Sequence, residues 1–162
     1  MTRLSRLRLL STIGLFAAAV PSLFATLTLT TSTNSVAIPF ATTDYNKATG
    51  AAQIIKTSAQ TLTILSTTAT WTLSVRALTS TFTFAPSAGD PNPSKPAADL
   101  AVRAPATSAT WLALTTTNQV LSTGPKSASN QTRALDYRLN SNLNSNPPGT
   151  YTISVIYTLT SP

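Results

Sequence analysis

Residues 149–162 read Gly149-Thr-Tyr-Thr-Ile-Ser-Val-Ile-Tyr-Thr-Leu-Thr-Ser-Pro162. Large apolar side chains occupy every second position from Tyr151 to Leu159, and hydroxyl residues fill the positions between them, with Ile156 as the exception. A helix would repeat its apolar face after three and four residues, whereas a half-buried strand repeats it after two. The pattern therefore predicts a β-strand, preceded by the turn residues 147–149, which read Pro-Pro-Gly.

Residues 69–77 alternate in the same way and place Trp71, Leu73 and Val75 on one face. No stretch of eleven or more residues shows a helical period, and Thr, which is abundant throughout, favours strands. We therefore expect an all-β protein, a single β-sandwich (immunoglobulin-like or a related Greek key) of about nine to eleven short strands. The other expected strands are residues 26–31, 36–40, 52–57, 60–66, 80–85, 99–104, 109–116, 119–122 and 134–140.

Two polar segments interrupt this pattern. Residues 86–98 hold four prolines together with Gly, Asn, Asp and Ser, and this composition predicts a Pro-rich loop. Residues 124–130 begin with Gly-Pro and are otherwise polar, so we expect a second loop there.

The N-terminal residues have the composition of a secretory signal peptide. Three arginines lie within the first eight residues, and an apolar run follows from Leu9 to Val20. This run is shorter than the ~20 residues that cross a bilayer, although an uncleaved anchor is the alternative. We expect residues 1–25 to be a signal peptide of bacterial type, with cleavage after Ala25. Residues 26–162 then form one β-sandwich domain that is secreted, extracellular or associated with the cell envelope, with no transmembrane segment after cleavage.

The charge of the chain argues against a nucleic-acid partner. The sequence has a formal net charge of +7, but three of its eleven basic residues belong to the expected signal peptide. Eight basic and four acidic residues remain, which is a net charge of +4 without a cluster. Nucleic-acid-binding proteins concentrate basic residues in a patch or stripe, which this sequence does not do. The chain also has no cysteine, so no disulfide contributes to its stability.

The residue types argue against catalysis. General acid–base chemistry uses histidine or paired carboxylates, but the chain has no histidine and its four acidic residues are scattered aspartates. Asp90, Asn92 and Asp99 carry the oxygen ligands that Ca²⁺ prefers, but Lys95 lies between them and two carboxylates are few. We therefore expect neither an enzyme nor a cofactor nor a metal site.

Two short motifs carry a resemblance to a known family. Residues 71–73 read Trp-Thr-Leu, and residues 157–159 read Tyr-Thr-Leu near the C-terminus. The chain resembles the WxL domain of bacterial surface proteins, which has one Trp-x-Leu in mid-domain and a second near the C-terminus, although Tyr157 stands where the family has Trp. The resemblance implies an extracellular β-rich module that attaches non-covalently to the cell wall, with peptidoglycan as the partner. It marks Trp71, Leu73, Tyr157 and Leu159 as core or ligand-contacting residues.

Two functions are consistent with these observations. The first is a non-enzymatic secreted module that associates with the bacterial cell wall or envelope, where exposed aromatic rings would contact sugars. The candidates for such contacts, if they are exposed, are Tyr45, Trp111 and Tyr137. The second is a structural subunit of a surface fibre or layer, in which residues 26–31 add as a strand to a neighbouring molecule. Other surface proteins are further possible partners, since a module of this kind can also act only within a complex.

Overall fold

The computed structural model describes residues 25–86, 94–106, 108–147 and 149–162. The signal peptide predicted for residues 1–25 therefore lies outside the described residues except for Ala25. Within the described part, no helix is long and apolar enough to cross a membrane. The elements are β1 (Leu27–Thr31), η1 (Thr42–Asp44), β2 (Ala51–Ser66), β3 (Trp71–Ala77), β4 (Thr83–Pro86), η2 (Ala97–Asp99), β5 (Leu100–Arg103), β6 (Leu112–Ala113), β7 (Gln119–Gly124), β8 (Ser127–Asn142), β9 (Gly149–Thr152) and β10 (Val155–Thr160).

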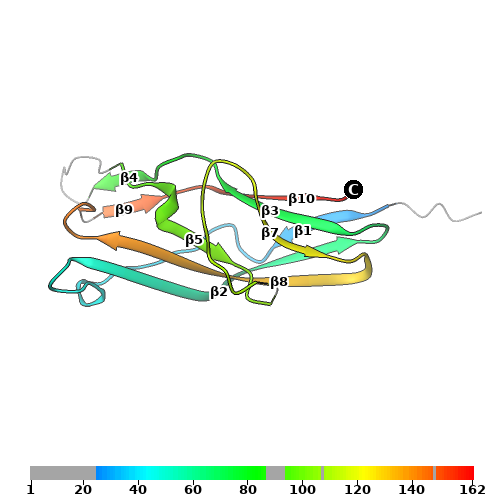
Figure 1. Ribbon diagram of the computed structural model, residues 1–162, viewed down its shortest axis with the longest axis horizontal. Coiled ribbons are helices and arrows are strands. Elements are labelled where there is room, and N and C mark those ends of the chain that lie inside the picture. Colours follow the sequence, from blue (N-terminus) through cyan, green and yellow to red (C-terminus); the bar gives the residue numbers. More distant parts are fainter. Residues whose placement is uncertain (1–24, 87–93, 107, 148) are drawn as a thin grey trace, which may run out of the picture.

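The strands form an antiparallel β-sandwich, as the sequence predicts (Figure 1). One layer is a five-stranded sheet with the order β1-β2-β8-β5-β6. The other layer consists of a three-stranded sheet, β10-β3-β7, and the two-stranded sheet β4-β9. Figure 1 shows both layers extended along the same long axis, with β4 and β9 at one end and β10 and β1 near the other.

The strand predicted for residues 149–162 is in fact two strands. β9 pairs with β4, whereas β10 pairs with β3, so the two halves belong to different sheets. The backbone leaves the ladder at Ile153 and Ser154, where the Leu78 amide donates a hydrogen bond to the Ser154 carbonyl at 2.9 Å. Alternation of side chains continues across such a break, and for this reason the sequence pattern does not reveal it.

Two of the strands are much longer than expected. β2 and β8 each contain 16 residues and pair with one another over most of their length. The two strands predicted for 52–57 and 60–66 are one strand, with an irregularity between Lys56 and Gln60 where Ser58 has a φ of 46°. The loop predicted for 124–130 is wrong for most of its length because β8 begins at Ser127. Polar residues are tolerated there because this part of the ladder is largely exposed.

Other predicted elements are shorter or absent. Residues 36–40 form no strand, in keeping with Pro39, which has no amide to donate to a ladder. Only Leu112 and Ala113 of the stretch 109–116 are in a strand. The Pro-rich loop predicted for 86–98 lies partly outside the described residues, and its last two residues belong to the 3-10 turn η2.

The core lies between the layers and is centred on β3. Trp71, Leu73, Val75 and Ala77 are buried, while the residues between them are half-buried, which is the alternation read from the sequence. The Trp71 ring lies directly over Gly124 of β7, where a Cβ atom would overlap the indole. Burial of each large apolar side chain contributes about 1.5–3 kcal/mol. β3 therefore holds the second layer against β2 and β8.

Candidate binding groove

A groove with a volume of about 900 Å³ lies in the sandwich. One side is formed by the irregular segment 34–41, which follows β1 along the chain. Most of the other lining residues are Pro147 and residues of β8, β9 and β10, with single residues such as Gln60 and Phe82 from elsewhere. In Figure 1 the segment after β1 runs toward the end of the molecule that carries β9.

Two of the half-buried tyrosines in this groove, Tyr45 and Tyr151, are held by a hydrogen bond and by packing against another ring. Tyr45 donates a hydrogen bond to Ser141 Oγ at 3.3 Å, and its ring lies 5.7 Å from that of Phe40. Tyr151 donates to the Pro147 carbonyl at 2.8 Å, and its ring lies 4.7 Å from that of Phe84. Both rings are thus fixed in place by hydrogen bonding and packing while part of each surface stays accessible. Aromatic faces of this kind, next to amide and hydroxyl groups, suit a sugar or another partly polar ligand.

A directed chain of hydrogen bonds crosses the interior beside the groove. Tyr137 donates to Gln60 Oε1, and Gln60 Nε2 donates to Thr31 Oγ1 at 2.7 Å and to the Thr33 carbonyl at 2.8 Å. The hydroxyl groups of Tyr137 and Tyr157 are also hydrogen-bonded to each other. Because the Tyr137 proton is already given to Gln60, Tyr157 is the donor in this bond.

This environment changes the acidity of both tyrosines. Burial raises the pKa of Tyr137 above its ordinary value of 10.0, and the hydrogen bond with Tyr157 partly opposes that rise. Burial is also the main reason that the pKa of Tyr157 is raised, and the neighbouring Tyr137 raises it further through its charge and its hydrogen bond. Both groups therefore stay neutral at physiological pH and hold the layers together as hydrogen-bonding groups.

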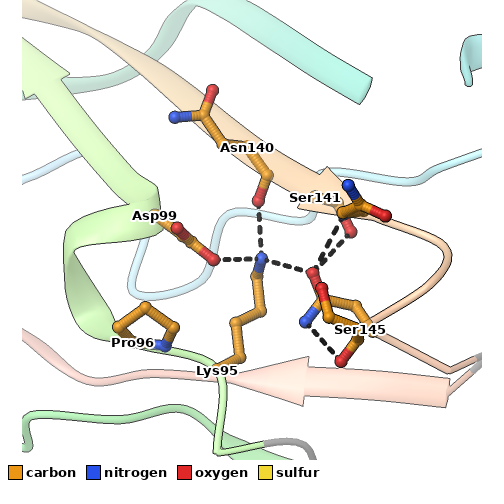
Figure 2. A pocket seen from close by; sticks show the side chains of 8 residues that line it. Lys95, Pro96, Asp99, Asn140, Ser141 and Ser145 are labelled. Carbon is orange, nitrogen blue, oxygen red and sulfur yellow. Dashed lines mark hydrogen bonds and ion pairs between the residues drawn. The ribbon is translucent and has the colours of Figure 1, made fainter. Parts of the chain in front are cut away.

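A buried lysine is among the residues that line the groove, and Figure 2 shows its surroundings. Lys95 is only 2% exposed, and its Nζ donates three hydrogen bonds. The acceptors are Asp99 Oδ2 at 2.6 Å, the Asn140 carbonyl at 2.6 Å and Asn146 Oδ1 at 3.1 Å. The rings of Phe82 and Tyr151 lie 5.8 and 6.0 Å from Nζ. A smaller cavity of about 340 Å³ adjoins this cluster.

The structure places the three aromatic candidates differently. Tyr45 lines the groove and is half-buried. Tyr137 also lines the groove, but it is only 5% exposed. It is therefore not one of the exposed aromatic residues that could contact a sugar. Trp111 is half-buried outside the groove, with the Arg103 and Arg138 guanidinium groups 4.4 and 4.9 Å from its ring. Tyr45 is thus the one member of this set that is both accessible and in the groove.

The four motif residues lie on the paired strands β3 and β10. Leu73 is opposite Leu159, and Tyr157 is opposite Val75. Trp71 and Leu73 are 1% and 0% exposed, which makes them core residues rather than ligand contacts. Leu159 packs against the core from the partly buried edge strand, and Tyr157 lines the groove.

Sequence reasoning missed the Lys95 cluster and the role of Tyr151. Asp99 was considered for its oxygen atoms, but in the structure its carboxylate is paired with Lys95. Lys95 and Asn146 are 51 residues apart and outside the strands, so no local pattern joins them. The one available signal was a lysine within a Pro-rich stretch that has few other charges.

Compared with known proteins, the chain matches no protein-family model and no curated protein. The resemblance to the WxL domain therefore rests on residues 71–73 and 157–159 alone.

Proposed function

We propose that this protein is a non-enzymatic, secreted surface module that binds a glycan polymer of the bacterial cell wall in the groove between segment 34–41 and strands β9 and β10. The observation that carries the proposal is the groove itself, which presents two fixed, half-buried tyrosines beside amide and hydroxyl groups. Peptidoglycan is the partner that the WxL-like motifs imply. Secretion follows from the signal peptide read in the sequence.

The size and chemistry of the groove support a chain-like ligand. A volume of about 900 Å³ is at the upper end of the range for small-molecule sites, and the groove is lined by residues far apart in the sequence. Its lining combines rings such as Tyr45 and Tyr151 with hydrogen-bonding groups such as Asn34 and Thr150. Flat aromatic faces pack on the apolar faces of sugars, while amides and hydroxyls match sugar hydroxyls.

Co-sedimentation with purified peptidoglycan sacculi, at low and at moderate salt, tests this proposal. Binding through rings and neutral hydrogen bonds should persist at moderate salt, whereas attraction by the net charge alone would be screened. We expect Tyr45→Ala and Tyr151→Ala to reduce the pelleted fraction several-fold, because each removes a ring from the groove. Unfolding curves of each variant show whether the fold is retained.

Trp111→Ala is the matched control because it removes an aromatic ring outside the groove. It should leave pelleting unchanged. Loss of all pelleting at moderate salt, or pelleting that neither groove variant reduces, would contradict the proposal.

The alternative of a fibre subunit depends on β1. In the structure β1 pairs with β2 of its own chain over five residues, as an edge strand that is largely exposed. Strand addition to a neighbour would require β1 to leave this position. Deletion of residues 26–33 separates the two functions: a folded monomer that no longer assembles would support the fibre, whereas unfolding would show that β1 serves its own domain.

A further inference from the structure

We propose that Lys95 and Asn146 join covalently, forming an amide bond between Lys95 Nζ and Asn146 Cγ with release of ammonia, and that Asp99 moves the protons of this reaction. The inference rests on an amine, a carboxamide and a carboxylate held together in a buried cluster (Figure 2). It is independent of the ligand proposed for the groove.

The nucleophile is already placed beside its target. Lys95 Nζ lies 3.1 Å from Asn146 Oδ1, and the carbonyl carbon is one bond, about 1.2 Å, from that oxygen. Rotation about the lysine side-chain bonds is enough to bring Nζ to the ~3–3.5 Å from Cγ that attack requires. Burial at 2% exposure, with the rings of Phe82 and Tyr151 close by, keeps water from competing for either group.

The carboxamide is polarised for attack. Besides the lysine, Asn146 Oδ1 accepts a hydrogen bond from the Asn142 amide at 3.0 Å and one from Ser141 Oγ at 3.3 Å. Attack on Cγ moves negative charge to this oxygen, and donors aimed at it stabilise the tetrahedral intermediate. Asn146 Nδ2 donates to the Ser145 carbonyl at 3.1 Å, which fixes the amide with Oδ1 toward the lysine.

Asp99 has the position of a proton carrier. Its Oδ2 lies 2.6 Å from Lys95 Nζ, and its side chain is 30% exposed through the adjoining cavity. The carboxylate takes a proton from the ammonium group, and the free amine attacks Cγ. The Cγ–Nδ2 bond then breaks, and the leaving nitrogen receives protons by way of Asp99. The balance is one lysine ammonium and one asparagine amide giving one secondary amide and one ammonium ion, with no oxidant or external reagent.

The bond would join two connecting segments of the chain and so close a loop between them. It would link Lys95, two residues before the start of η2, to the connection between β8 and β9, across a sequence separation of 51 residues. In a chain without cysteine, no disulfide can serve this purpose. The link would also fix part of the groove wall, since Lys95 and Asn146 both line it.

Intact-mass spectrometry of the purified protein, followed by peptide mapping, tests the proposal. We expect a mass below the sequence mass by one ammonia, and a branched peptide that contains both Lys95 and Asn146. Asn146→Asp should lose one water instead, because the same amide then forms from a carboxylic acid. Lys95→Met and Asp99→Ala should retain the full sequence mass, and we expect the Lys95→Met protein to melt about 10 °C lower because the cross-link is missing.

Lys56→Met is the matched control, because Lys56 Nζ donates to the Ala37 carbonyl rather than to a carboxamide. It should show the same loss of ammonia as the unchanged protein. A native protein with its full sequence mass overturns the proposal, whether or not any variant folds. Loss of ammonia without the branched peptide overturns it as well, because this would place the reaction elsewhere in the chain.

Discussion

The Tyr157 hydroxyl donates its hydrogen bond to the Tyr137 hydroxyl, and this bond joins the two layers of the sandwich. Tyr157 belongs to β10 and Tyr137 to β8. From Tyr137 the chain of bonds continues through Gln60 on β2 to Thr31 on β1. Four strands from both layers are therefore connected by one series of hydrogen bonds with a single direction.

Tyr157→Phe should lower the free energy of unfolding by about 1–2 kcal/mol, because it leaves the buried Tyr137 oxygen without its donor. Urea unfolding measures this change. The control is Tyr45→Phe, whose hydroxyl contacts Ser141 at 3.3 Å in a less buried place, and which should cost less than about 0.5 kcal/mol. Equal losses in the two variants would show that the Tyr157–Tyr137 hydrogen bond stabilises the fold no more than the Tyr45–Ser141 hydrogen bond does.

The same pair should make the protein sensitive to alkali. Burial raises the pKa of Tyr137 and of Tyr157 above 10.0, so the unfolded chain loses these protons at lower pH than the folded one. The contribution to stability is complete below pH ~10 and is lost as pH rises beyond it, by up to about 1.4 kcal/mol per pH unit for each tyrosine. Urea midpoints between about pH 9 and about pH 11 measure the slope. The Tyr137→Phe/Tyr157→Phe protein should show a shallower slope, and an unchanged slope would contradict this account.

Gly124→Ala should destabilise the protein by about 1–3 kcal/mol, because the new methyl group would overlap the Trp71 ring and displace it from the core. Thermal or urea unfolding measures the effect. Thr123→Ala, at the exposed neighbouring position on β7, should change stability by less than about 0.5 kcal/mol. If Gly124→Ala is equally mild, the packing of Trp71 on β7 is looser than described.

Asp136→Ala should cost about 3 kcal/mol, because this buried carboxylate holds two elements at once. Its Oδ2 accepts from the Arg103 guanidinium at 2.9 Å, and its Oδ1 accepts from the Ser58 amide at 2.9 Å in the irregular part of β2. Asp44→Ala removes an exposed carboxylate that accepts a hydrogen bond from the Ala41 amide, and it should cost about 1 kcal/mol or less. Similar losses of stability in the two variants would show that the buried Asp136 stabilises the fold no more than the exposed Asp44 does.

Alternation in the sequence was enough to predict the all-β sandwich and the buried face of β3. It did not distinguish one strand from two. Residues 149–162 alternate without interruption although their ladder changes sheets at Ile153, because the change is caused by the partner strands β3 and β4. Conversely, the polar composition of residues 127–130 concealed a strand, because β8 begins beside the end of β2 with side chains that are largely exposed.

The candidate site was less predictable than the fold. Tyr45 was recognised as an aromatic candidate, but its neighbours in the groove come from segments that only the folded chain brings together. Lys95 and Asn146 lie in connecting segments, where composition predicts exposure, and long-range packing buries them instead. Contacts of this kind depend on the whole topology and cannot be predicted from a short stretch of sequence.

The pairing of β2 with β8 has a mechanical consequence. Each strand of 16 residues is about 50 Å long, and its ladder bonds lie across the strand direction. A pull that draws the two strands past each other along the long axis would load many of these bonds simultaneously rather than one after another. Single-molecule stretching with handles at opposite ends of β2 and β8 should therefore meet a higher rupture force than peeling the two strands apart from one end.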